Sequence, residues 1–341
     1  MALSRPGVIN NTAGTWAQDN ALFLKVFSGE VLTSFKRSCI FDQFVQTRTI
    51  QSGRSAQFPV TGRFTASYHT PGDLIEGQGN MGQNEVVIRI DDYLLADAQL
   101  YSLDDAKNHY DIRSIYSSEL GQALARTHDK RIAAEITIAA RTATADLTAD
   151  LPAGLTPDQQ ARTGTRIDLN DAEPTADDYV AAVFQAAADL DEKDVSPEGR
   201  VLVCQPEIYY ELVQSSRAVN QDFNQQGVNG SYKEGQIAKL AGFNIYSSNH
   251  LQSQGNRTAL AGEQGYVFNG TLVDSDVDMR QTRMLAFQKG CVGVVKLRDL
   301  SMGMTGNDYD VMYAATLMTA KMAVGVGALR PECAVEVYNS Q

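Results

Sequence analysis

The chain has 341 residues, of which 43% are hydrophobic and 21% are charged, and its formal net charge at pH 7 is −12. This composition is close to that of ordinary globular proteins and excludes a disordered chain, while the length suggests two or more domain-like units. The acidic excess argues against generic nucleic-acid binding, because phosphate neutralisation needs clustered Lys and Arg.

The N-terminal part is predicted to be an arm followed by an amphipathic helix. Residues 1–19 are small and polar apart from Trp16, so they have no core of their own. A lone tryptophan in such an arm is either simply exposed or an anchor at a protein interface. Asn20 is expected to cap a helix over 21–36. The apolar face of this helix comprises Phe23, Phe27, Val31 and Phe35.

Alternating sequence then predicts an extended β-hairpin. Strands are expected in residues 45–64 and 84–97, on either side of a glycine-rich tract that follows Pro71. This tract lacks the G-K-[ST] and G-x-G-x-x-G patterns of phosphate-binding loops, and no helix follows it directly. Because a two-stranded hairpin is not stable alone, we expect it to pack on another body or another chain.

The longest predicted element is a helix over 102–142. It starts at Ser102–Asp105, which resembles a capping box, and no proline interrupts it up to Arg141. At 1.5 Å of rise per residue it would span about 60 Å, several times the average length, so we expect it to act as a spine for other elements. Its apolar stripe comprises Ile112, Tyr116, Leu120, Leu124, Ile132 and Ile136.

Beyond the spine, the sequence predicts an acidic loop and then a compact α/β unit. Residues 143–174 are acidic and rich in turn residues, and a capping box at Thr175–Asp178 begins a helix. A second helix starts at Pro206, and a third is expected from the capping box Ser231–Glu234 to Gly242. Strands are expected at 200–204, 243–247, 284–287, 291–300, 311–324 and 334–338. The pattern of the fifth of these strands suits a helix as well.

The sequence lacks the motifs of the common enzyme and metal-site classes. None of its four histidines falls in H-E-x-x-H, its four cysteines are far apart, and no G-x-S-x-G is present. Asp274–Asp278 resembles the first half of a calcium loop, but Met279 stands where that loop needs glycine. We therefore expect no enzyme activity, no cofactor and no metal. The lack of an apolar run of eighteen residues and of a signal-peptide pattern predicts neither a membrane span nor secretion.

The charge is unevenly distributed along the chain. Residues 1–65 carry seven basic residues against three acids, a balance of +4, whereas 144–199 carries three basic residues against thirteen acids, a balance of −10. This pattern fits solvated faces, and it also fits two surfaces that attract each other between subunits.

Six short blocks, taken together, resemble a known family. They are Ala21–Phe27, Gly29–Thr33, Ser55–Val60, Asn108–Asp111, Val294–Leu300 and Gly327–Glu332. In this order they closely resemble the major capsid protein of T-seven-like short-tailed phages. The resemblance runs from residue 20 to the C-terminus and is weak in 1–20, in 143–174 and at the hairpin tip.

The resemblance implies an α+β fold of the Hong-Kong-97 phage capsid type. It would divide the chain into an N-terminal arm and helix (1–54), an extended β-hairpin loop (55–98), a peripheral domain with the long spine helix (99–142 and 288–341) and an axial domain (143–287). The covalent crosslinks found in some relatives of this fold are not expected, because the hairpin has no lysine between Gly62 and Asp92.

The implied function is self-assembly into the hexamers and pentamers of an icosahedral phage head that encloses double-stranded DNA. The implied partners are further copies of the chain, a scaffolding protein and a portal protein at one vertex. The DNA would be enclosed without sequence-specific binding, and no membrane takes part. The protein would be assembled in the host cytoplasm and reside in the virion. A decoration or tail protein is the alternative, although neither should need this spine and arm.

Residues of the hairpin and the arm are expected to lie between subunits in such a head. They are Phe58, Arg63, Phe64, Tyr68 and Arg89 in the hairpin, and Trp16, Phe23 and Phe27 in the arm. The alternative for each is packing within its own subunit. In this fold the spine helix is bent in the precursor shell and straighter after expansion. We expect Gly121 to ease that bend; its close packing against a strand is the alternative.

Overall fold

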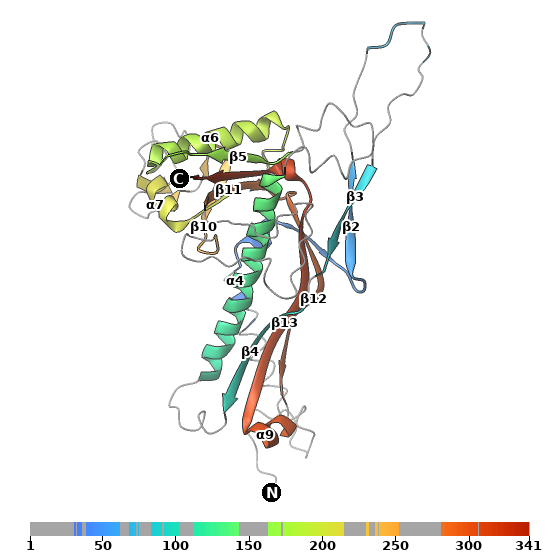
Figure 1. Ribbon diagram of the computed structural model, residues 1–341, viewed down its shortest axis with the longest axis vertical. Coiled ribbons are helices and arrows are strands. Elements are labelled where there is room, and N and C mark those ends of the chain that lie inside the picture. Colours follow the sequence, from blue (N-terminus) through green and yellow to red (C-terminus); the bar gives the residue numbers. More distant parts are fainter. Residues whose placement is uncertain are drawn as a thin grey trace.

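One long helix lies against two β-sheets (Figure 1). The computed structural model describes residues 31, 33–35, 39–61, 68–72, 74, 83–90, 92–101, 112–142, 163–171, 173–214, 230–231, 236–237, 239–251, 281–305 and 307–340. The helix is α4 (Ile112–Arg141), which confirms the predicted spine over its described part. Residues 102–111 of the predicted helix lie outside the described residues.

The first sheet has four strands and runs along the N-terminal half of α4. In spatial order they are β1 (Gln46–Thr49), β12 (Val292–Met304), β13 (Ala315–Ala328) and β4 (Leu94–Tyr101). β1 pairs with β12 in parallel, and the other pairs are antiparallel. One face of β4 packs on the helix through alternate residues, as its period of two requires, and the other face is more exposed.

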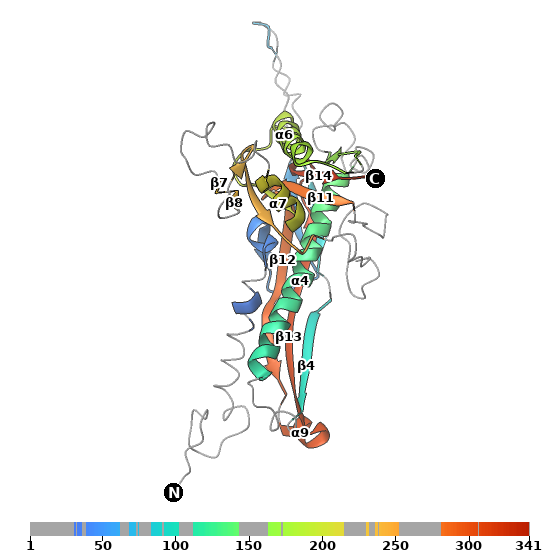
Figure 2. The same cartoon turned by 90° about the vertical axis from the view of Figure 1, so that its left-hand side faces the viewer.

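The second sheet has six strands and packs against the C-terminal half of α4, and two shorter helices belong to the same core (Figure 2). Its spatial order is β5 (Thr165–Asp168), β14 (Ala334–Tyr338), β11 (Thr282–Gln288), β6 (Arg200–Cys204), β10 (Phe243–Ser247) and β9 (Lys239–Leu240). The helices are α6 (Ala176–Glu192) and α7 (Pro206–Gln214), which contact each other. The predicted capping box of Thr175 and Asp178 is confirmed.

Smaller elements complete the described chain. They are two strand pairs, β2 (Ser55–Thr61) with β3 (Gln83–Arg89) and β7 (Gly230–Ser231) with β8 (Gln236–Ile237), the 3-10 turns η1 (Phe41–Phe44) and η5 (Pro331–Cys333), and the helix α9 (Asn307–Tyr313). The antiparallel pairing of β2 with β3 confirms the predicted hairpin.

The spine helix joins two hydrophobic cores. Leu120 and Leu124 pack with Val31, Phe35 and the four-stranded sheet. The second core lies between the six-stranded sheet and the C-terminal half of α4, where residues 131–140 are all buried. A helix that is buried on every side loses the simple apolar stripe expected from the sequence. Tyr116, predicted to lie in that stripe, is 38% exposed.

The predicted helix between Ser231 and Gly242 is wrong. The described residues there form short strands, and Ala241 and Gly242 both have positive φ, of 49° and 84°. Two consecutive residues with positive φ form the tight turn that joins β9 to β10. Gly242 therefore serves a hairpin turn, whereas its sequence context also fits the end of a helix.

The strand predicted over 311–324 begins later, at Ala315. The residues before it form α9, whose first turn carries Asn307 and Asp308, residues that favour a helix start. α9 is followed by Ala314, which has a φ of 50° and donates its backbone N–H to the carbonyl oxygen of Asp310 at 2.7 Å, as at a helix C-terminus.

Hydrogen bonding also bears on the expected division into domains, which stays a prediction. β14 lies within 288–341 but pairs with β5 and β11 of the six-stranded sheet, so the C-terminal strand belongs by its bonding to the other body.

Candidate functional site

The hairpin β2–β3 is fixed at its base to the four-stranded sheet. Phe58 of β2 is 8% exposed and packs with Ile88 of β3 and Val295 of β12. Gly325 of β13 permits the close approach of β3, because a Cβ at that position would lie 2.1 Å from the carbonyl oxygen of Arg89. The base of the hairpin is therefore held by its own subunit, and most of the Phe58 ring is covered there.

The hairpin carries exposed apolar side chains beyond this base. Tyr68 is fully exposed and Leu74 is 83% exposed. Arg89, a charged residue at the base of the hairpin, is exposed as well. Five further residues predicted to lie between subunits are outside the described part of the chain: Trp16, Phe23, Phe27, Arg63 and Phe64. Contact of any of these residues with another subunit stays a prediction.

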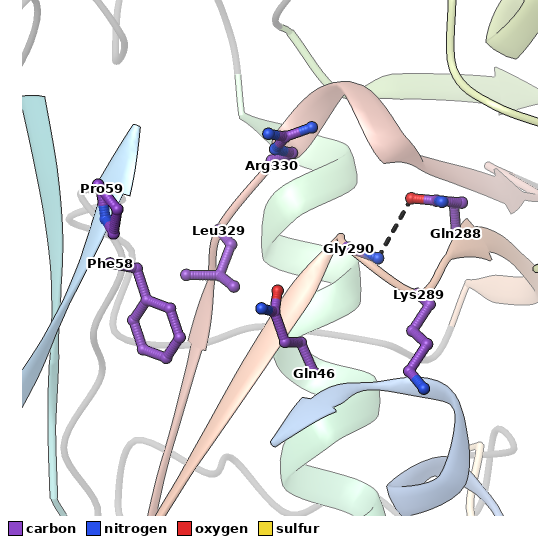
Figure 3. A pocket seen from close by; sticks show the side chains of 8 residues that line it. All are labelled: Gln46, Phe58, Pro59, Gln288, Lys289, Gly290, Leu329 and Arg330. Carbon is purple, nitrogen blue, oxygen red and sulfur yellow. Dashed lines mark hydrogen bonds between the residues drawn. The ribbon is translucent and has the colours of Figure 1, made fainter. Parts of the chain in front are cut away.

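A cavity of about 580 Å³ opens beside Phe58 (Figure 3). Phe58 and Leu329 supply apolar wall, and two cations border it, Lys289 from the β11–β12 turn and Arg330 from the end of β13. Within the described residues neither cation forms an ion pair. A third cation, Arg48 of β1, lies 5.6 Å from the centroid of the Phe58 ring. Sequence analysis did not single out Lys289 or Arg330 as site residues, although Arg330 lies in the block Gly327–Glu332, because only the fold brings the two together.

A second apolar surface lies at the far end of the four-stranded sheet, where α9 forms the tip (Figure 1). Val311 and Met312 are 80% and 76% exposed, and Tyr313 is exposed beside them. Tyr101, at the end of β4 and paired with Ala315, is exposed at the same end. Sequence analysis did not predict this surface, because in the strand expected over 311–324 alternate residues would have pointed inward.

A buried carboxylate joins the end of the spine helix to the six-stranded sheet. Glu336 of β14 is fully buried and accepts hydrogen bonds from Arg141 of α4 at 2.9 and 2.7 Å. Arg166 of β5 donates to it at 3.1 Å, and the Thr282 hydroxyl of β11 donates at 2.6 Å. Four elements thus meet at one carboxylate, both oxygens of which accept hydrogen bonds.

A second polar cluster joins η1 to the middle of α4. Asp42 lies 3.4 Å from Nε2 of the buried His128 and accepts a hydrogen bond from Lys296 of β12 at 3.0 Å. Burial acts to raise the pKa of Asp42, but His128 and Lys296 outweigh it and lower the pKa from 3.8 to about 2. This carboxylate is therefore ionised throughout the neutral range.

The next residue along the chain, Asp129, holds a neighbouring segment to the same helix. It is fully buried and accepts hydrogen bonds at 2.8 Å from the backbone N–H of Ile40 and at 2.8 Å from the ring of His250. Both contacts stabilise the packing of distant segments on α4. His128 and His250 each have a structural partner of this kind.

Gly121 of α4 permits a close approach of the N-terminal helical segment. A Cβ at this position would lie 2.6 Å from the carbonyl oxygen of Val31 and 3.1 Å from the backbone nitrogen of Phe35. The backbone that packs closely against Gly121 therefore belongs to a helical segment. The alternative that we expected was packing against a strand. The role of Gly121 in bending stays a prediction.

The described residues offer no other chemical centre. They contain no group of three or more metal-ligating side chains, and none of their helices is long and apolar enough to cross a membrane. The four cysteines are free thiols, and burial raises the pKa of Cys204 and Cys333 to about 12, so both are protonated and unreactive at neutral pH. The calcium-like sequence Asp274–Asp278 lies outside the described residues. What the molecule does offer is a set of surfaces: the hairpin, the cavity and the tip.

Comparison with known proteins places these surfaces in context. Residues 57–338 match the family described as "Gp10A-like: Major capsid protein". The major capsid protein of Escherichia phage T7 is 34% identical over 319 residues, covering 92% of this chain and 90% of that protein. The major capsid protein of Enterobacteria phage T3 is 32% identical, with coverages of 95% and 94%. Among solved structures, the capsid of the cyanophage P-SCSP1u aligns with a TM-score of 0.74 and 38% identity, over 100% of this chain and 99% of that one.

Proposed function

The chain belongs to the Gp10A-like family of major capsid proteins, and from this membership we propose that it assembles its shell through the hairpin, the cavity and the tip. It is a major capsid protein of a T7-like short-tailed phage, has the Hong-Kong-97-type fold and resides in the capsid shell of the virion. The observation that carries the proposal is the match to a capsid subunit over the whole length of both chains. The role is structural, and hexamers and pentamers are its units.

The hairpin supports this proposal by its exposure. A two-stranded hairpin needs a surface to lie on, and among its described residues those at the base pack on the rest of the subunit. Tyr68 and Leu74 stand free in the single chain, although side chains of this kind gain stability from burial. A neighbouring subunit would supply the missing surface.

The tip supports it in the same way. Val311, Met312 and Tyr313 form a run of exposed apolar side chains at the end of the molecule that is far from the six-stranded sheet. A run of this kind marks an interaction site, since isolated exposed residues need no explanation but contiguous ones do. We place contacts between neighbouring capsomers here.

We also propose a scaffolding protein, a portal protein at one vertex and packaged double-stranded DNA as partners. The net charge of −12 supports a wall that does not bind DNA tightly, because a basic lining would hold phosphates nonspecifically. Charge also keeps the free subunit soluble before it assembles.

Electron microscopy and sedimentation velocity of the full chain, expressed alone and with a scaffolding protein, test the assembly role. Shells or capsomers are expected in at least one of these preparations. Persistent monomers in both would contradict it.

The tip is tested with Met312→Lys, which should reduce the yield of shells while leaving the melting temperature of the free subunit unchanged. Lys239→Glu, at an exposed site away from the tip, is the control.

A further inference from the structure

The cavity beside Phe58 has features of a binding site that its own subunit does not fill. Its volume of about 580 Å³ lies in the range of sites that accept a ligand or a large side chain. Its wall combines the apolar Phe58 and Leu329 with the cations Lys289 and Arg330. Neither cation has an ion-pair partner within the described residues. An occupant of matching chemistry would have an apolar group next to negative charge.

The outer face of α6 is a stretch of the described surface of this same chain that has this chemistry. Phe184 is 54% exposed on this face, and the residues one turn away on either side, Ala181 and Ala188, are small and exposed. The ring therefore projects beyond its neighbours. Asp177 and Asp191, seven residues before and after Phe184, lie on the same face because seven residues make nearly two helical turns.

The two surfaces are complementary in shape and charge. A projecting ring next to acids matches a cavity that has both an apolar wall and two cations at its border, with Gln46 and Gln288 as further polar lining. An aromatic side chain that becomes buried supplies much of the energy of an interface. α6 lies in the segment 144–199, whose charge balance is −10. The contact would therefore be one in which this acidic segment faces basic residues of another subunit. The positive side of the contact is the cavity with Lys289 and Arg330, and Arg48, from residues 1–65, lies nearby at 5.6 Å from the centroid of the Phe58 ring.

We propose that α6 of one subunit inserts Phe184 into the cavity beside Phe58 of the next subunit, with acids of α6 facing Lys289 and Arg330. The contact joins two different surfaces, so it is heterologous and can close into a ring. It deepens the proposed function and rests on it, because it specifies one contact within the capsomers that the family membership implies.

Two pairs of charge reversals test the contact in the full chain. Lys289→Glu with Arg330→Glu reverses the cavity. Asp177→Lys with Glu192→Lys, the latter at the exposed acid that follows Asp191 at the end of α6, reverses the helix while leaving the ion pair of Asp191 with Arg200 in place. Each pair alone should reduce the fraction of assembled protein about tenfold, as measured by sedimentation. All four changes in one chain should restore assembly to within about threefold of the wild type.

Co-expression of the two reversed chains provides a sharper test. In a mixture, the reversed cavity of one chain is complementary to the reversed helix of the other chain, and the unmodified cavity of the second chain is complementary to the unmodified helix of the first. The two kinds of chain must therefore alternate around a ring. Strict alternation is possible in a ring of six subunits but not in a ring of five, so hexamers should form again while pentamers should not. Recovery only when all four changes are in one chain would place the contact within a subunit and overturn the proposal.

Further outcomes separate this contact from the other possibilities. Phe184→Ala should reduce assembly, whereas Tyr210→Ala, at an exposed aromatic of the neighbouring α7, should not. A defect of the cavity variant that no change in α6 rescues would mean that another occupant fills the cavity, and would overturn the proposal. Unchanged melting temperatures of the free subunits exclude misfolding as the cause. Failure of the wild type to assemble would instead contradict the assembly role itself.

Discussion

Arg141, the last residue of the spine helix, holds the buried Glu336 of β14 by two hydrogen bonds, of 2.9 and 2.7 Å. The pair is bidentate, which fixes the direction of the helix end relative to the strand as well as their distance. β14 lies inside the six-stranded sheet, so this contact ties the end of α4 to the interior of that sheet. It adds a charged link to the apolar core that the C-terminal half of α4 already shares with the sheet.

Glu336→Gln should lower the free energy of unfolding of the free subunit by about 1.5–3 kcal/mol. The change keeps the shape of the side chain but removes the negative charge that two arginines and Thr282 share. Urea denaturation measures the difference. Glu207→Gln, at an exposed position of α7, is the matched control and should change little. Equal stabilities of the Glu336 variant and the wild type would show that the junction contributes only geometry.

The cluster at Asp42 predicts a loss of stability at acidic pH. Its pKa in the folded chain, about 2, is below the ordinary value of 3.8, so the folded state binds fewer protons than the unfolded state between these values. The stability that Asp42 contributes is therefore complete above about pH 4 and is lost as the pH falls toward 2. Asp42→Asn should flatten this part of the pH dependence, measured by thermal melting from pH 5 to pH 2. Asp97→Asn, on the exposed face of β4, should not.

Gly121→Ala separates the two roles considered for that glycine. The close contact with Val31 predicts an overpacked junction and a loss of about 1–3 kcal/mol in the free subunit, before any assembly. A role in bending predicts altered expansion of precursor shells instead. Ala123→Gly, at an exposed site two residues away, is the matched control, because it adds flexibility without removing a contact. Ala123→Gly should itself cost about 1 kcal/mol, because glycine is the poorer helix former, so the two variants are compared by their expansion rates. If both expand at the wild-type rate, bending is not the role of Gly121.

The sequence predicted what local periodicity and capping determine. The burial of Ile132 and Ile136 and the capping box at Thr175 follow from spacing alone. The β9–β10 hairpin was mistaken for a helix because a positive φ at Gly242 suits both a hairpin turn and the end of a helix. Long-range pairing decides between the two, and a single sequence does not show it.

The same limit applies to the candidate site. Phe58 was identified from the resemblance, but its partners Val295 and Leu329 are more than two hundred residues away along the chain. Lys289 and Arg330 follow different strands and meet only because β12 and β13 are antiparallel neighbours. A cavity formed in this way carries no local signal, so sequence reasoning had no means to find it.

Gly325→Ala should loosen the hairpin without unfolding the subunit. The added Cβ would meet the carbonyl oxygen of Arg89 at 2.1 Å, and backbone at that distance must move away. The shift would carry β3 off the sheet and open the cluster around Phe58 and Ile88, so amide hydrogen exchange in β2 and β3 should speed up by at least about tenfold. Gly303→Ala is the matched control on the neighbouring strand β12, where the nearest atom would be a side-chain oxygen at 3.3 Å. Because the hairpin must have the correct orientation to contact a second subunit, the Gly325 variant should also assemble poorly. Normal assembly despite faster exchange in the hairpin would show that the packing of its base does not determine its orientation.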